Sequence, residues 1–187
     1  MVRKIAAFIL KSFGWEIKGT ADYLVKCVIC VAPHTSNWDL FWGQLVYLSL
    51  GRKAYFLIKK SWFFFPMNLF FRTIGGIPVD RSKKNAMTNL LVGEFTRRRK
   101  FHLAITPEGT RKRTKKWKQG FYYIALAAHV PIVVVALDYG SRIIDFKKIF
   151  YPTGDVERDI PEIISHYKGT VARHPERFDM PEEGQTA

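Results

Sequence analysis

A nearly unbroken apolar run, Ile-Val-Val-Val-Ala-Leu, occupies residues 132–137 and ends at Asp138. A strand with water on one face alternates apolar and polar residues, whereas a continuous apolar run is typical of a strand buried on both faces. Residues 23–32 are also apolar and β-branched, and Pro33 follows them. Strands of this kind occur in sheets that have helices on both sides. The chain is therefore expected to have a core built around such a sheet.

Segments with helical spacing alternate with the segments that have strand character. This alternation predicts an α/β fold with a mixed, largely parallel central sheet flanked by helices, and with an N-terminal amphipathic helix. The expected helices cover residues 2–13, 37–50, 84–99, 120–128 and 155–173. Beyond the two strands above, the expected strands cover residues 54–58, 77–80 and 101–105, with an edge strand at 143–150.

The length of 187 residues fits one domain, and the sequence shows neither an internal repeat nor a low-complexity linker. Within residues 1–187 we expect an amphipathic N-terminal segment at 1–20, a motif-bearing core at 21–150, a helical part at 151–178 and a frayed tail at 179–187. The tail is assigned on its content of Pro, Glu, Gly and Gln.

Cys27 and Cys30 have the spacing of a redox or metal-binding pair. On a strand, however, a spacing of three places the two side chains on opposite faces. The second cysteine pair that a four-cysteine zinc site requires is not in the sequence. We therefore interpret both residues as buried thiols of a protein from a reducing compartment.

The charge is strongly positive, with 30 Lys and Arg against 16 Asp and Glu and a net charge of +14. Such a balance implies an anionic partner, which could be nucleic acid, an anionic membrane or a phosphorylated substrate. Basic residues are concentrated at 112–118, a segment suited to phosphates of coenzyme A, an acidic carrier protein or lipid headgroups, or simply to solvent. Trp117 in this segment suggests a position at headgroup depth.

Two apolar segments indicate contact with lipid. Residues 2–13 place apolar side chains on one helical face, with Lys4 and Lys11 on the other, so this helix is expected either to lie on a membrane or to pack on the core. Residues 62–71, Trp-Phe-Phe-Phe-Pro-Met-Asn-Leu-Phe-Phe, are shorter than the ~20 residues needed to span a bilayer. They could line an acyl-chain tunnel, dip into the bilayer or fill the core. Neither a spanning helix nor a signal peptide is expected.

His34 and Asp39 form the first candidate for chemistry, in the block Pro-His-Thr-Ser-Asn-Trp-Asp at 33–39. His34 follows a predicted strand, and Asp39 lies one turn into the next predicted helix. A carboxylate that accepts from one imidazole nitrogen leaves the other nitrogen free to take a proton. Ser36 and Asp39 also have the spacing of a helix capping box, and the two interpretations are compatible.

Three further blocks stand at predicted strand ends, where ligands bind in open α/β sheets. Residues 75–81 contain a Gly pair and end in Arg81, and residues 106–111 read Thr-Pro-Glu-Gly-Thr-Arg. Arg81 and Arg111 each offer a planar fork for phosphate, and Glu108 could hold Arg111 or a substrate hydroxyl. The fourth block is the strand segment 130–136. Taken singly, these blocks also fit an ion pair, a turn and a core strand.

The four blocks in this order resemble the signature of the glycerolipid acyltransferase superfamily, whose best-known members are 1-acylglycerol-3-phosphate acyltransferases. The departures from that pattern include Pro33 in place of Asn, Pro78 in place of an aromatic residue and Thr106 in place of Phe. The matching positions are His34, Ser36 and Asp39 in the first block, Gly75, Asp80 and Arg81 in the second, Glu108, Gly109, Thr110 and Arg111 in the third, and Val130, Pro131, Ile132 and Val133 in the fourth.

The resemblance implies transfer of a fatty acyl group from acyl-CoA or acyl carrier protein to a lysophospholipid hydroxyl, in phospholipid biosynthesis. The implied acceptor is 1-acylglycerol-3-phosphate, with another lyso-lipid, such as an aminoacyl lyso-lipid, as the alternative. No metal or cofactor is expected, and the enzyme would bind the cytoplasmic face of an anionic membrane as a peripheral or monotopic protein. The implied catalytic residues are His34 and Asp39, and the implied substrate-binding residues are Ser36, Arg81, Glu108, Gly109, Thr110 and Arg111.

Two other classes of protein fit parts of the sequence. A nucleic-acid-binding protein would account for the basic charge and the interspersed aromatic residues. It would leave the His34 and Asp39 pair and the order of the four blocks unexplained, so nucleic acid is not an expected partner. An inactive lipid-binding relative is disfavoured because His34 and Asp39 are both present.

Overall fold

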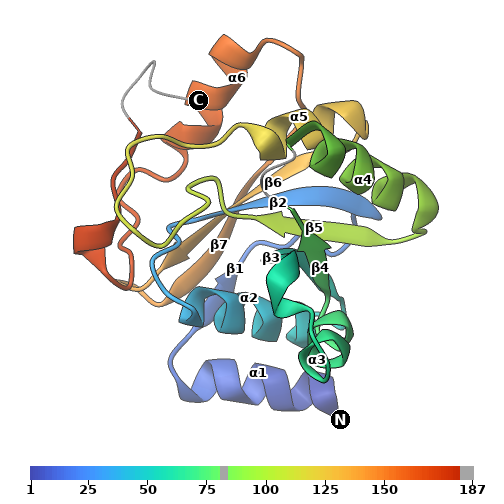
Figure 1. Cartoon of the computed structure of the whole chain (residues 1–187). Helices are drawn as coiled ribbons and strands as arrows, with labels where there is room; N and C mark the ends of the chain where they lie inside the picture. The colour runs from blue at the N-terminus through green and yellow to red at the C-terminus, as the bar shows by residue number, and fades with distance from the viewer. Residues whose placement is uncertain (81–83, 182–187) are drawn as a thin grey trace.

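The structure, a computed structural model, describes residues 1–80 and 84–181. A seven-stranded sheet forms its centre, in the order β1-β7-β6-β2-β5-β3-β4. All neighbouring strands are parallel except β6 and β7, which are antiparallel. Helices cover both faces of this sheet (Figure 1). The predicted α/β class with a mixed, largely parallel sheet is confirmed.

The strands fall close to their predicted positions, and β5, β6 and β7 have the predicted bounds. The strand at 143–150 is wrongly predicted as an edge, because it lies between β6 and a short strand that the sequence pattern did not reveal. The strands are β1 Glu16–Lys18, β2 Lys26–Ala32, β3 Ala54–Lys59, β4 Gly76–Val79, β5 Phe101–Ile105, β6 Ile132–Asp138 and β7 Ile143–Phe150.

The helices also follow the predictions, except for a helix at Met67–Thr73 that was not predicted and for a difference near the C-terminus. There the last helix ends at Ser165 rather than at 173, because the chain turns over the next residues and Gly169 takes a positive φ of 78°. The α-helices are α1 Val2–Ser12, α2 Trp38–Ser49, α3 Met67–Thr73, α4 Lys84–Arg97, α5 Gly120–Ala127 and α6 Val156–Ser165, and the 3-10 helices are η1 Lys60–Trp62 and η2 Pro175–Arg177.

The sheet separates two hydrophobic cores. Helices α4, α5 and α6 pack on one face, and α1 and α2 cover the other (Figure 1). Every residue from 132 to 137 is buried, as the apolar run predicts for a strand covered on both faces. Cys27 and Cys30 are free, buried thiols that belong to different cores, so their interpretation as buried thiols is confirmed.

Helix α1 packs on the core, and it also leaves apolar side chains exposed. Ala6 and Leu10 are buried against the core, whereas Ile5 and Phe8 are 49% and 71% exposed. The helix therefore packs on α2 through one edge and presents apolar side chains to the outside with another. Among the described residues, no helix has the length and apolar character needed to cross a bilayer.

Residues 62–71 do not fill the core, and that alternative is wrong. They comprise the last residue of η1, a short connection and the first part of α3, and Phe65 and Leu69 are 85% and 69% exposed. Trp117, in contrast, was expected at the surface and is buried. Its side chain is fully buried against Tyr167, with ring centroids 5.2 Å apart, so the expected position at headgroup depth is wrong.

The C-terminal segment is held against the domain at its beginning. Asp179 accepts two hydrogen bonds from the Arg113 guanidinium, at 2.7 and 3.0 Å, and Met180 packs against the core. The remainder of the predicted frayed tail, 182–187, lies outside the described residues.

Candidate active site

The site forms where three neighbouring parallel strands end. Strand β2 pairs with β5 on one side and β6 on the other, so their carboxyl ends meet at one edge of the sheet. Ligands bind at this edge in open α/β sheets. The loop after β2 carries His34, the loop after β5 carries the block 106–111, and Tyr139 follows β6 directly.

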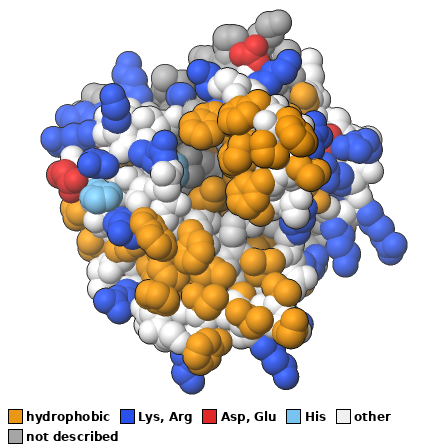
Figure 2. Space-filling view, turned by 60° about the horizontal axis from the view of Figure 1, so that its bottom comes forward, with side chains coloured by type: hydrophobic (Ala, Val, Ile, Leu, Met, Phe, Trp, Pro, Cys, Tyr) orange, Lys and Arg blue, Asp and Glu red, His pale blue; other side chains and the backbone are white. Residues whose placement is uncertain are grey.

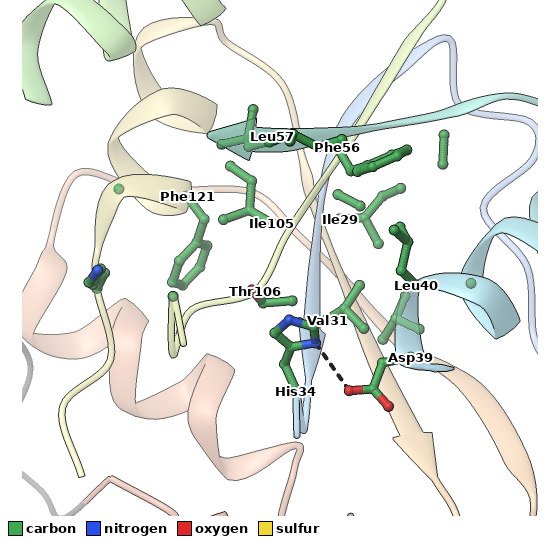
Figure 3. Close-up of a pocket in the computed structure, with 18 of the residues that line it drawn as sticks. Ile29, Val31, His34, Asp39, Leu40, Phe56, Leu57, Ile105, Thr106 and Phe121 are labelled. Carbon is green, nitrogen blue, oxygen red and sulfur yellow. Dashed lines mark hydrogen bonds and ion pairs between the residues drawn. The ribbon is translucent and has the colours of Figure 1, made fainter. Parts of the chain in front are cut away.

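His34 and Asp39 are in contact, as their spacing predicts. The Nδ1 atom of His34 lies 3.1 Å from Oδ2 of Asp39 (Figure 3). A carboxylate can only accept, so this contact places the proton on Nδ1. The other ring nitrogen, Nε2, points away from Asp39, toward Thr106 in Figure 3. The imidazole is therefore oriented as a base whose free nitrogen faces the cavity.

Asp39 is itself tightly held, with its side chain almost completely buried. Its Oδ2 atom also accepts from the backbone N–H groups of Thr35 and Ser36, both at 2.8 Å. The contact with Ser36 is the reach-back hydrogen bond of a capping box, so Asp39 orients His34 and stabilises the start of α2 together. Its Oδ1 atom accepts from the Tyr139 hydroxyl at 2.7 Å.

Glu108 lies next to His34 and binds the backbone of this residue rather than its ring. Its Oε1 atom accepts from the His34 backbone N–H at 2.8 Å, and its side chain is only 5% exposed. Burial raises the pKa of Glu108 to about 7, and the hydrogen bond from His34 acts in the opposite direction. The structure thus gives Glu108 a partner other than the Arg111 side chain or substrate hydroxyl that the sequence suggested.

A cavity of about 1310 Å³ adjoins His34. Its lining includes residues of the sheet, of α2 and of helices α4 and α5, and apolar side chains make up most of the lining that Figure 3 labels around His34. Trp62 and Phe71 also line it, which agrees with the tunnel alternative for residues 62–71. The apolar lining includes Ile29, Val31, Leu40, Phe56, Leu57, Val135 and Leu137.

Another part of the cavity wall is cationic. Arg111, Lys112 and Lys118 all line it, with Gly109 and Thr110 between them and the strand end. This side of the cavity suits a phosphate group, while the apolar side suits an acyl chain. Lys118 is held here because its backbone N–H donates to the carbonyl of Pro107 at 2.8 Å.

Gly109 is required where Lys118 approaches the turn. It has a positive φ of 62°, and a Cβ atom at this position would lie 2.8 Å from the Lys118 Nζ. The conformation and the close approach both favour glycine. Gly109 therefore allows the Lys118 ammonium group to lie directly over the turn of the third block.

The predicted site residues thus fall into three groups. His34, Asp39, Gly109, Thr110 and Arg111 line the cavity. Ser36 and Glu108 are not among the described lining residues; the Ser36 hydroxyl accepts from the Trp38 backbone N–H at 3.2 Å. Arg81 lies outside the described residues. In the described parts of the chain, no group of three or more His, Cys, Asp or Glu side chains is placed to hold a metal ion.

The sequence analysis did not single out Tyr139 or Lys118, although both belong to the site. Tyr139 follows the strand of the fourth block by one position, so the expected meeting of strand ends could have drawn attention to it. Lys118 was grouped with the basic segment at 112–118. No local pattern in the sequence predicts the hydrogen bond from its backbone N–H to the carbonyl of Pro107.

The fold and the paired His34 and Asp39 beside an apolar cavity define a class of enzyme, and comparison with known proteins agrees. The model of the family described as Acyltransferase matches residues 18–138. The chain belongs to the acyltransferase family.

Particular relatives fall within the glycerolipid branch. The chain is 31% identical over 159 residues to human 1-acyl-sn-glycerol-3-phosphate acyltransferase beta, covering 82% of this chain and 56% of the human protein. The chain therefore spans little more than half the length of this relative. Its fold is similar to that of the 1-acyl-sn-glycerophosphate (LPA) acyltransferase PlsC from Thermotoga maritima, with a TM-score of 0.55, 17% identity, and coverage of 86% of this chain and 72% of that one.

Proposed function

We propose that this protein transfers a fatty acyl group from an acyl thioester to the hydroxyl of a lysophospholipid, in phospholipid biosynthesis, with 1-acylglycerol-3-phosphate as the acceptor. The observation that carries the proposal is the position of His34. Its Nε2 faces a cavity that has an apolar side for an acyl chain and a cationic side for a phosphate. The name of the human relative supports the same acceptor class.

The reaction follows from this geometry. The acceptor hydroxyl attacks the thioester carbonyl carbon while His34 Nε2 takes its proton, a step worth roughly 10²–10⁴-fold in rate. Asp39 stabilises the imidazolium that forms, through the contact at Nδ1. The carbon–sulfur bond then breaks, and the imidazolium returns the proton to the departing thiolate. All of these steps use groups of the chain, so the proposal includes neither a metal nor a cofactor.

The cationic side of the cavity would hold the acceptor phosphate. Arg111 can bind two phosphate oxygens through its planar fork, and Lys118 adds a second positive charge nearby. Arg113 has a different role, since its guanidinium is paired with Asp179. An acceptor with a terminal phosphate would use both charges, whereas a lyso-lipid with a larger headgroup would present one phosphodiester charge.

The protein would meet its lipid substrates at a membrane surface. Exposed apolar side chains gather on the face made by α1, α2 and α3, with Lys and Arg around them (Figure 2). We call this set the apolar face; it consists of Val2, Ile5, Phe8, Trp38, Leu40, Phe41, Leu48, Trp62, Phe64, Phe65, Leu69 and Phe70.

The apolar face is continuous with the cavity, because Leu40 and Trp62 belong to both. An acyl chain could therefore pass from a bilayer into the cavity without crossing water. The surrounding basic residues favour an anionic surface such as the cytoplasmic leaflet. These features support peripheral binding of the protein at that leaflet.

An acceptor panel tests the proposed function. Purified protein in detergent would be given palmitoyl-CoA, or palmitoyl acyl carrier protein in a parallel series, together with single lyso-lipids. Thiol release and product mass would be measured for lysophosphatidate, lysophosphatidylglycerol and an aminoacyl lyso-lipid. The proposal predicts diacylated product with lysophosphatidate. Product with another lyso-lipid alone would assign that acceptor instead, and no product from any donor and acceptor pair would contradict acyl transfer.

A further inference from the structure

Tyr139 joins the catalytic pair from the end of the strand that carries the fourth sequence block. It is the first residue after β6, and its hydroxyl donates to Oδ1 of Asp39 at 2.7 Å. The other oxygen, Oδ2, already accepts from His34 Nδ1 and from two backbone N–H groups. Both carboxylate oxygens of Asp39 are therefore fixed, and they are fixed by different parts of the chain.

Tyr139 is itself held by two separate segments, one that contains Trp15 and one at residues 171–173. Its ring packs edge-on against Trp15, with centroids 5.0 Å apart. Its backbone N–H donates to the carbonyl of Val171 at 2.9 Å. The guanidinium of Arg173 lies 5.9 Å from its ring centroid and 5.2 Å from that of Trp38. These contacts hold the Tyr139 hydroxyl in a fixed position next to Asp39.

The hydroxyl remains a donor at all relevant pH values. Burial, together with the negative charge and hydrogen bond of Asp39, raises the pKa of Tyr139 far above the ordinary value for a phenol. A protonated phenol can donate a single hydrogen bond, and Asp39 Oδ1 receives it. The carboxylate plane is thereby set so that Oδ2 faces the imidazole.

We propose that Tyr139 is a positioning residue for acyl transfer, which holds the Asp39 carboxylate in the orientation that His34 requires and withdraws negative charge from it. This inference rests on the proposed role of His34 as the base. Two consequences follow from removing the hydroxyl. The carboxylate becomes less well oriented, which slows the chemical step, and it becomes more negative, which favours the protonated imidazole.

The other charged groups around His34 stay in place when the hydroxyl is removed. Asp39 contacts the imidazole from α2, and Glu108, in the loop after β5, accepts from the His34 backbone N–H. Arg111 approaches from the cavity wall, and Arg173 lies behind Tyr139. A change in the pH dependence of a variant that lacks only the hydroxyl can therefore be assigned to that hydroxyl.

The chain offers a matched control for this test. Tyr122 also donates its hydroxyl to a buried aspartate, Asp159, at 2.8 Å. That pair belongs to the core on the opposite face of the sheet, beside α6. Tyr122→Phe and Tyr139→Phe thus remove the same chemical group from the same kind of hydrogen bond, and both keep the aromatic ring.

The experiment compares the two variants with wild type in steady-state kinetics over a range of pH. For Tyr139→Phe, we expect kcat to fall roughly tenfold, as for a lost hydrogen bond to a charged group. Both KM values should stay within about twofold. The acid limb of the profile of kcat/KM against pH should move to higher pH. Tyr122→Phe should lower the melting temperature and leave the profile unmoved.

A third variant distinguishes failure of the Tyr139 role from failure of the proposed role of His34. His34→Asn serves as the reference, because the amide can still donate to Asp39 but cannot act as a base. If that variant is inactive while Tyr139→Phe keeps the wild-type kcat and pH profile, the positioning role is refuted. A fall in kcat with an unmoved acid limb, or an equal shift in Tyr122→Phe, would also refute it. If His34→Asn is fully active, the role of His34 as the base fails, whereas acyl transfer itself is tested separately by the acceptor panel.

Discussion

Glu108 makes the stability of this protein depend on pH in an unusual direction. Burial raises its pKa from 4.5 to about 7, so the folded protein keeps a proton that the unfolded chain has released. Between these two values the unfolded state binds fewer protons, and the free energy of unfolding therefore falls as the pH rises. This contribution is fully present below pH 4.5 and is lost by about pH 7.

The size of the effect follows from the same values. Each pKa unit corresponds to about 1.36 kcal/mol, so the rise from 4.5 to about 7 amounts to about 3 kcal/mol. Glu108→Gln removes the titration but keeps a side-chain oxygen that can accept from the His34 backbone N–H. Wild type should therefore lose about 3 kcal/mol more than this variant when the pH is raised across that window. The amide group changes the free energy of unfolding by the same amount at both pH values, so this change cancels when the two pH dependences are compared.

Urea unfolding followed by tryptophan fluorescence, at about pH 4.5 and about pH 8, measures this difference. Glu157→Gln is the control, because Glu157 is an exposed carboxylate on α6. It should show the wild-type pH dependence. Equal pH dependence of wild type and Glu108→Gln would refute the reasoning. The activity of Glu108→Gln should remain within about tenfold of wild type, because the oxygen that holds His34 is retained. A large rise in acceptor KM would instead indicate direct contact with substrate.

Three further substitutions test the substrate and membrane surfaces. Arg111→Ala should raise the KM for lysophosphatidate roughly ten- to a hundredfold with little change in kcat, whereas Arg113→Ala should leave it near wild type; similar KM values for both variants would contradict the phosphate site. Phe65→Ser should weaken sedimentation with anionic vesicles about tenfold or more, since an exposed phenyl group would no longer be buried in lipid, and unchanged sedimentation would remove Phe65 from the contact. Gly109→Ala should lower acceptor binding by displacing Lys118, and a variant with normal acceptor KM would show that this contact is dispensable.

The sheet could be predicted wherever a strand carries its own apolar pattern. The bounds of β6 were recovered because its compact apolar run follows Pro131 directly and ends at Asp138. Strand β1 was missed because Glu-Ile-Lys is too short to show a period, and it exists through pairing with a distant strand, β7. The same pairing explains why β7 is not an edge.

In the candidate site, too, contacts that are local in sequence could be predicted and distant ones could not. The contact between His34 and Asp39 is local in sequence, so their spacing was enough to predict it. The partners of Glu108 and Tyr139 are 74 and 100 residues away, and they meet because β2, β5 and β6 end side by side. Trp117 was misplaced for the same reason, since its basic neighbours gave no sign of the buried contact with Tyr167.

The central claim is that His34 is the base for transfer of an acyl group to a lysophospholipid. The most direct test is acceptor-dependent thiol release from palmitoyl-CoA, or from palmitoyl acyl carrier protein if the panel selects that donor. It would be measured for wild type, His34→Asn and His129→Asn. His129 is exposed with a φ of 51°, a conformation that Asn tolerates, so it is a suitable control. We predict that His34→Asn loses at least about a hundredfold in kcat while His129→Asn keeps wild-type activity. Full activity of a folded His34→Asn protein would contradict the claim.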